Sequence, residues 1–551
     1  MSRNRPTSTF TSVPAFASSS ALAVSPTPVM SRNPLAKHLL RCLLAGVFSI
    51  GGLTAANVAY AADAAAASDA ASTVTPQQIH IPAGNKTLGT FDAPAPETDA
   101  ALIERGRLLA VASDCMACHT VVNKGKAFAG GYGIVSPMGT IYSTNITPSK
   151  TNGIGNYTEA QFAAALREGV RADGSHLYPA MPYTSYTLMT DTDIHALYTY
   201  FMKGVTPVDT SPPETALPFP FNMRFSMAAW NLLFLHQQRF VSDPTKSVEW
   251  NRGAYLTTAL GHCDACHTPR NFLMAEDGNR AFAGAQLGAW YAPDITSDPV
   301  SGIGGWSNTE IVQYLKTGHV DGKNQAGGGM AEAVQNSLQF LSTDDLTAIA
   351  VYLKSTKPFR DPKDVKAAYT YGGPVATGTP DLESSLRGMS PQNSSESLKT
   401  GGALYSGSCA SCHGTVGEGS TNHAYPSLYH NTATGASDPS NLIATMLNGI
   451  DRTVGNEHVL MPSFGQNSYV DQLTDSQIAS IANYVLTQYG NPSDHVTEHD
   501  VSVARQGGQL PFLAWVQPYI VRGIIALIVV LLLVILGVAR MRSRRAKNKL
   551  K

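Results

Sequence analysis

Apolar residues recur three and four positions apart in three segments that lie far from one another along the chain. These segments are residues 190–204, 342–355 and 473–490, and Thr or Ser together with Asp opens each one. The spacing places the apolar side chains on one face of an α-helix, and Thr or Ser is a favoured N-cap. The pattern predicts three amphipathic helices, each of which closes one unit of the chain.

Two further stretches share a polar loop that runs into an apolar-faced helix. Residues 143–169 ("STNITPSKTNGIGNYTEAQFAAALREG") match residues 292–318 ("APDITSDPVSGIGGWSNTEIVQYLKTG"). Thr158 or Ser307 stands just before the helix, with Glu at or near its third position, which is the pattern of a capping box. No stretch shows the convincing alternation of a half-buried strand. The sequence therefore predicts a mostly α-helical, loop-rich protein.

A short motif, C-x-x-C-H, occurs three times. It reads "DCMACHT" at 114–120, "HCDACHT" at 262–268 and "SCASCHG" at 408–414. The second cysteines lie 148 and 146 residues apart, and a helix-like segment leads into each motif. Even spacing in similar flanks is typical of tandem repeats.

The two ends of the chain read as an export signal and a membrane anchor. A basic stretch at 37–41, an apolar stretch at 42–58 and "AYA" at 59–61 form a signal with a cleavage site, although an N-terminal anchor is an alternative. Met30 makes a better start than Met1.

The 17 uncharged, mostly apolar residues of 523–539 would extend about 26 Å as a helix, nearly enough to span a bilayer. A buried core helix is the alternative. The basic tail, 540–551, predicts a cytoplasmic C-terminus with everything between the signal and the span outside the cytoplasm.

Composition narrows the function. Apolar residues make up 43% of the chain and charged residues 14%, as in a folded protein. The 39 basic and 40 acidic residues give a net charge of −1, so no general attraction to nucleic acid is implied. Six of the seven cysteines belong to the motifs and the seventh, Cys42, lies in the signal, which leaves none for a structural disulfide.

The motif itself predicts covalent haem. A thioredoxin-like redox pair needs a βαβ context, which is missing, and a zinc site needs one ligand more than each motif offers. C-x-x-C-H is the attachment pattern of c-type haem, in which both thiols add to the haem vinyl groups and the histidine ligates the iron. The sequence predicts three haem c groups, attached through the six motif cysteines: Cys115, Cys118, Cys263, Cys266, Cys409 and Cys412.

Each iron has two axial positions. His119, His267 and His413 are predicted to fill one. A methionine in an irregular loop before the closing helix is the candidate for the other. The three candidates are Met181 in "YPAMPYTS", Met330 in "AGGGMAEA" and Met461 in "VLMPSFG". Simple packing by these methionines is the alternative.

Other side chains near the motifs compete for roles at the haems. The histidines at the right distance are His176, His319 and His458. His262 is expected at the surface or behind a ligand. Arg270 would pair with a haem propionate or remain solvated. With both axial positions filled, such a haem transfers electrons without bond chemistry, and no catalytic residue is predicted.

The chain resembles the cytochrome c subunits of bacterial membrane-bound dehydrogenases that oxidise alcohols, aldehydes, gluconate, sorbitol or fructose. "GTIYSTNITP", "GIGNYT", "YPAMPY" and "GHCDACHTPRN" carry the resemblance, which covers roughly residues 98–490. It implies a periplasmic partner subunit that holds pyrroloquinoline quinone, flavin or molybdopterin, and electron transfer to ubiquinone. The resemblance also implies the haem ligands named above. The C-terminal span favours aldehyde or sugar-type complexes.

The expected architecture is mostly α, with three tandem monohaem cytochrome c domains and a C-terminal transmembrane helix in the cytoplasmic (inner) membrane. Two rival functions remain: a donor subunit of a terminal oxidase, or a multihaem peroxidase with one open iron. The predicted division of the chain is an N-terminal extension and signal (1–61), domain 1 (98–204), a connector (205–246), domain 2 (247–355), a linker (356–395), domain 3 (396–490), a linker (491–522), the span (523–539) and the tail (540–551).

Overall fold

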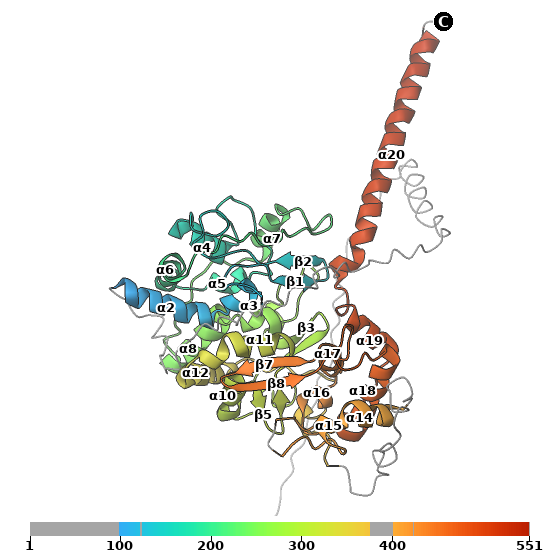
Figure 1. Ribbon diagram of the computed structural model, residues 1–551. Coiled ribbons are helices and arrows are strands. Elements are labelled where there is room, and N and C mark those ends of the chain that lie inside the picture. Colours follow the sequence, from blue (N-terminus) through green and yellow to red (C-terminus); the bar gives the residue numbers. More distant parts are fainter. Residues whose placement is uncertain (1–97, 122–123, 375–399, 422–423, 550–551) are drawn as a thin grey trace, which may run out of the picture. The chain divides into compact units, whose positions relative to one another are not determined.

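The computed structural model describes residues 98–121, 124–374, 400–421 and 424–549 (Figure 1). The predicted signal lies outside the described residues. Within them the protein is mostly helical, as expected. The sequence predicted no strands, and this was wrong: four antiparallel two-stranded hairpins are present. These hairpins are short. Turns that contain glycine and contacts with loops stabilise them more than an alternation of apolar and polar residues does.

The N-terminal unit places a long helix before the first motif and a helix pair after a hairpin. Thr158 caps α4 in a capping box whose third residue is Gln161 rather than Glu159. Its elements are α2(Asp99–Ala112), α3(Cys115–His119), β1(Gly133–Ser136), β2(Gly139–Tyr142), α4(Glu159–Glu168), α5(Tyr183–Tyr186), α6(Asp191–Thr199) and the π-helical turn η1(Tyr200–Gly204).

The middle unit repeats this order with additions. Ser307 caps α10 in a capping box with Glu310, as predicted. Its elements are α8(Val248–Tyr255), the π-helical turn η2(Leu256–Leu260), α9(Cys263–His267), η3(Gly278–Arg280), β3(Ala283–Leu287), β4(Trp290–Asp294), α10(Asn308–Thr317), β5(His319–Val320), β6(Asn324–Gln325), α11(Gly328–Asn336), η4(Leu338–Phe340) and α12(Thr343–Leu353).

The C-terminal unit also begins and ends with a helix, and the hairpin β7–β8 lies between them. Its elements are α14(Gly401–Ser408), α15(Ala410–His413), α16(Thr432–Gly435), α17(Ser440–Asn448), β7(Ile450–Val454), β8(Glu457–Met461) and α18(Asp475–Tyr489). The segment expected as a polar linker, 491–522, contains α19(Glu498–Arg505), whose Arg505 Nε donates to Asp475 of α18 at 2.7 Å.

A glycine marks the crossing of the first and last helices in all three units. A Cβ atom added at Gly106 of α2 would lie 2.1 Å from the Ala196 carbonyl oxygen of α6. At Gly253 of α8 it would lie 1.9 Å from the oxygen of Ala348 in α12, and at Gly401 of α14 it would lie 2.1 Å from that of Ser480 in α18. The same backbone-to-backbone approach therefore recurs at equivalent positions of the three units.

The units differ in how they share apolar side chains. Buried residues from Leu102 to Leu353 form one core that runs through both the N-terminal and middle units, while a second core lies within the C-terminal unit. Tyr255 of α8 donates to Asp193 of α6 at 2.6 Å inside the shared core. The predicted units at 98–204 and 247–355 therefore share one continuous interior.

The connector carries α7(Ser226–Phe234), which touches both of the first two units. Trp230 Nε1 donates to the Leu273 oxygen, and Asn231 Nδ2 donates to the Glu168 oxygen. Leu232 is 87% exposed, so the opposite side of α7 is uncovered. The predicted linker at 356–395 is partly described: residues 356–374 contain η5(Ala368–Thr370), and Arg360 Nε donates to Asp298 at 2.7 Å.

The last helix, α20(Phe512–Lys549), is long and apolar enough to cross a membrane. It begins eleven residues before the predicted span, so Trp515 and Tyr519 lie on the helix rather than in a linker. Their rings are 5.5 Å apart, and both are more than half exposed. The helix therefore suits a membrane anchor with an aromatic end.

Candidate functional site

Each C-x-x-C-H motif forms a short helix of one turn. α3 and α9 run from the first cysteine to the histidine, and α15 covers Ala410–His413. Asp114 and His262, just before the first two helices, have left-handed backbone conformations that turn the chain from the preceding helix into the motif. One helical turn places two cysteines three positions apart on the same side, as attachment to two haem vinyl groups requires.

The motif histidines are oriented in the same way in all three units. The Nδ1 atom of His119 lies 2.7 Å from the Thr144 oxygen, that of His267 lies 2.7 Å from the Pro293 oxygen, and that of His413 lies 3.0 Å from the Pro426 oxygen. A backbone carbonyl at Nδ1 fixes the tautomer and leaves Nε2 to bind iron. Burial lowers the pKa of each of these histidines, which keeps the imidazole neutral, as a ligand must be.

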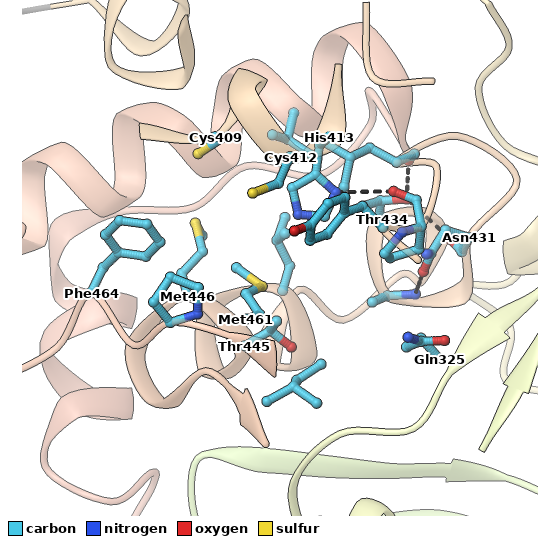
Figure 2. A pocket seen from close by; sticks show the side chains of 18 of the residues that line it. Gln325, Cys409, Cys412, His413, Asn431, Thr434, Thr445, Met446, Met461 and Phe464 are labelled. Carbon is cyan, nitrogen blue, oxygen red and sulfur yellow. Dashed lines mark hydrogen bonds between the residues drawn. The ribbon is translucent and has the colours of Figure 1, made fainter. Parts of the chain in front are cut away.

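A largely apolar cavity of the C-terminal unit brings the predicted ligands together. Cys409, Cys412, His413 and Met461 all line it. Figure 2 shows the cysteine sulfurs and the His413 ring on one side and the Met461 thioether on the facing side. The lining therefore supplies two thiols, an imidazole and a thioether to one cavity, which is the donor set that a covalently held haem would require. Hydrophobic walls exclude solvent from a haem, and this exclusion influences its reduction potential.

The motif cysteines lack the properties of the alternative sites. Burial raises the pKa of Cys115, Cys263 and Cys409 to about 12, whereas a thiol redox pair needs a lowered pKa. All six are free of disulfides. Across the described ranges, no three His, Cys, Asp or Glu side chains gather as a metal-ion site would require.

The three candidate methionines occupy different local structures. Met181 lies in a loop before Pro182, as expected, and packs against the shared core. Met461 ends strand β8, and Met330 lies in the first turn of helix α11, so neither is in the irregular loop that the sequence predicted. Iron ligation by these residues remains a prediction, and for Met461 the shared cavity supports it.

Two of the three competing histidines contact an aspartate, and the third has a buried ring nitrogen without a partner. His458 Nε2 contacts Asp451 Oδ1 at 2.8 Å and the residue does not line the cavity, although its neighbours do. His319 Nε2 contacts Asp321 Oδ1 at 2.8 Å. The Nδ1 atom of His176 is buried without a hydrogen-bond partner. His262 packs its ring edge-on against Tyr186, with centroids 5.6 Å apart.

Arg270 has protein partners rather than solvent alone. Its guanidinium donates to the Ala265 oxygen and lies 3.4 Å from Glu276. Two further features depend on contacts between units and were not predicted. Ser185 donates to Asp264 inside the second motif, at 3.1 Å, and Gln325 of the middle unit lines the cavity of the C-terminal unit. No periodic pattern signals either contact.

Comparisons with known proteins also indicate a cytochrome c. A family model described as cytochrome c matches residues 103–204 and 398–488. The fructose dehydrogenase cytochrome subunit of Gluconobacter japonicus is 47% identical over 455 residues, which are 81% of this chain and 92% of that one.

Two further relatives are each 38% identical. For the cytochrome c subunit of the alcohol dehydrogenase (quinone) of Gluconacetobacter polyoxogenes, the match covers 76% of this chain and 87% of that one. For the gluconate 2-dehydrogenase cytochrome c subunit of Pantoea cypripedii, it covers 76% and 93%.

Proposed function

This chain belongs to the family of cytochrome c subunits of dehydrogenase complexes, and from that premise we propose that it carries three covalent haems and passes electrons from a dehydrogenase subunit to ubiquinone. A bound haem c supplies a one-electron iron couple. The protein supplies the attachment, the axial ligands and a dry surrounding. The partner subunit oxidises the substrate, and this chain relays the electrons.

The observation that carries the proposal is the threefold repetition of the motif geometry. The family model matches the first and last units, while the middle unit, 247–355, lies outside its match. The middle unit nevertheless has the motif helix α9, the crossing glycine Gly253 and the His267 contact to a backbone carbonyl. We therefore assign a haem to the middle unit as well, held by Cys263, Cys266 and His267 with Met330 as the second axial candidate.

The first two motifs lie on either side of a short protein bridge. Tyr186 donates to the Ser113 oxygen, directly before the first motif, at 2.7 Å. Its ring contacts His262, directly before the second motif. Next to it, Ser185 donates to Asp264 inside the second motif. Because these contacts hold the two attachment helices at a fixed separation, we propose direct electron transfer between the first two haems.

We propose that α20 anchors the chain with its haem-bearing units on the periplasmic side. The apolar part of α20 is exposed along its length, Trp515 and Tyr519 mark one end, and the basic tail beyond Arg540 marks the other. Positive residues favour the cytoplasmic side, and aromatic residues favour the membrane interface. The predicted export signal is consistent with this orientation.

The partner is proposed to be a periplasmic dehydrogenase with pyrroloquinoline quinone, flavin or molybdopterin. The relative at 47% identity is named for fructose, so a sugar is the first substrate to test, followed by alcohols and aldehydes. Oxygen or peroxide chemistry on this chain would need an open iron. Binding of carbon monoxide to the reduced protein distinguishes that function from pure electron transfer.

Haem counting tests the proposal. Three variants, each with one motif's cysteines changed to serine, are compared by intact mass of the mature protein. Each variant should lose one haem of three, including Cys263→Ser/Cys266→Ser, while Cys42→Ser, outside the motifs, should keep all three. Loss of no haem in the middle-unit variant would leave a two-haem protein and refute the count.

A further inference from the structure

One wall of the C-terminal cavity comes from another unit. The residues that line the cavity lie between Tyr405 and Val485, with the single exception of Gln325 on strand β6 of the middle unit. Figure 2 shows the Gln325 amide at the edge of this cavity. Here one unit contributes a polar side chain to a largely apolar cavity of another unit. Such burial costs free energy unless the polar group forms a hydrogen bond.

Gln325 is distinguished from the other polar residues there by its hydrogen bonds. Its Oε1 atom is buried and has no partner. By contrast, Asn431 Nδ2 donates to the Ser427 oxygen at 3.1 Å, and Thr434 Oγ1 donates to the Leu428 oxygen at 2.7 Å. A buried amide oxygen without a partner has lost its hydrogen bonds to water and gained none in return. A ligand with a polar group at this place would relieve that cost.

The chemistry of haem c identifies that group. The vinyl-derived edge of the porphyrin carries the thioether bonds, and the two propionates project from the opposite edge. Attachment at Cys409 and Cys412 would therefore direct the propionates away from these cysteines, toward the far side of the cavity. Figure 2 shows Gln325 and Asn431 on that side, away from Cys409 and Phe464. Half a turn of the terminal amide directs an N–H group instead of the oxygen at a carboxylate.

The backbone on both sides of Gln325 is fixed by the C-terminal unit itself. The Lys323 oxygen accepts from the Thr432 amide and from its hydroxyl, both at 2.8 Å. The Ala326 oxygen accepts from Nη1 of the fully buried Arg452 at 2.8 Å. Because both anchors come from the unit that owns the cavity, Gln325 keeps its place in the cavity wall.

We propose that Gln325 is a cofactor-binding residue that donates a hydrogen bond from Nε2 to a propionate of the haem in the C-terminal unit. This inference rests on the proposed third haem. An ionised propionate favours ferric over ferrous iron. A donor that disperses the propionate's negative charge holds the reduction potential higher. The middle unit thus tunes the haem of its neighbour.

The test is spectroelectrochemistry of the full-length protein in detergent at one mildly alkaline pH. Gln325→Leu keeps the side-chain size and removes the donor, so the midpoint potential of one haem should fall while the others stay in place. The haem that shifts should be the one missing from a Cys409→Ser/Cys412→Ser variant.

Gln339→Leu is the matched control. Gln339 also crosses the boundary between the units, since its Nε2 donates to the Thr453 oxygen and its Oε1 accepts from the Gly455 amide, but it does not line the cavity. Gln339→Leu should lower the free energy of unfolding without changing the midpoint potential of any haem. If Gln325→Leu fails to fold, Gln325→Glu retains size and polarity and should lower the same potential by repelling the propionate.

The outcomes separate the two claims. An unchanged potential in both Gln325 variants, or a shift in a haem that survives the Cys409→Ser/Cys412→Ser change, overturns the role of Gln325 and leaves the haem assignment intact. If that cysteine variant loses no haem, the proposed function itself fails.

Discussion

The crossing glycine of the middle unit gives a prediction whose size follows from the structure. Gly253→Ala would place a Cβ atom 1.9 Å from the Ala348 oxygen and 2.9 Å from Tyr352 Cβ. Real Cβ contacts begin near 3.0 Å, so α8 and α12 would have to separate by about 1.1 Å. The obstacle is backbone and cannot move aside as a flexible side chain would.

Two terms of opposite sign set the magnitude. Overpacking typically costs about 1–3 kcal/mol, and the upper part of that range applies to a backbone clash. Alanine gains about 1 kcal/mol over glycine in helix propensity. The net loss should be about 1–2 kcal/mol, or a fall of roughly 2–8 °C in the unfolding temperature of the core that the first two units share.

Thermal unfolding of the haem-loaded protein, followed by far-ultraviolet circular dichroism, measures this loss. Gly278→Ala is the control in the same unit: Gly278 is exposed, and nothing lies within 4 Å of an added Cβ. It should be neutral or slightly stabilising. Equal behaviour of the two variants would refute the close helix crossing, and with it the equivalence of the middle unit to its neighbours.

Three further changes probe the C-terminal half. Thr474→Ala removes the capping box that Thr474 forms with Gln477, and should cost about 1 kcal/mol in denaturant unfolding; an unchanged midpoint would contradict the cap. Met461→Leu should open one iron to carbon monoxide in the reduced protein, whereas Met446→Leu, in the same cavity wall, should not; binding in both or neither would remove Met461 as a ligand. Deletion of 512–551 should release a haem-loaded protein into the soluble fraction, and continued sedimentation with membranes would show a second anchor.

Local signals in the sequence predicted the helices well. The N-caps Thr158 and Ser307 act at the next few residues, and the closing helices α6, α12 and α18 follow from their own apolar spacing. The hairpin β7–β8 was missed because a tight turn at Gly455 and pairing with its own return strand hold it, and such pairing leaves little alternation in the sequence.

Most of the features that the sequence did not predict depend on contacts between units. The continuous core of the first two units and the place of Gln325 depend on how repeats pack, which no window of sequence contains. The motif cysteines and histidines could be predicted from the sequence because covalent haem attachment requires a fixed spacing. Met330 was chosen as a methionine in a glycine-rich stretch before the closing helix, and that pattern gave no sign that it would lie on helix α11.

The central claim is that electrons from a partner's substrate pass through this chain to quinone. The most direct measurement is purification of the complex from its native membranes in mild detergent, followed by addition of fructose, then an alcohol or aldehyde, while haem absorption is recorded. We expect a co-purifying dehydrogenase subunit, reduction of all three haems by one of these substrates, and reoxidation by added ubiquinone. Co-purification of oxidase subunits, or a carbon-monoxide-binding haem with no dehydrogenase and no reduction by substrate, would contradict it.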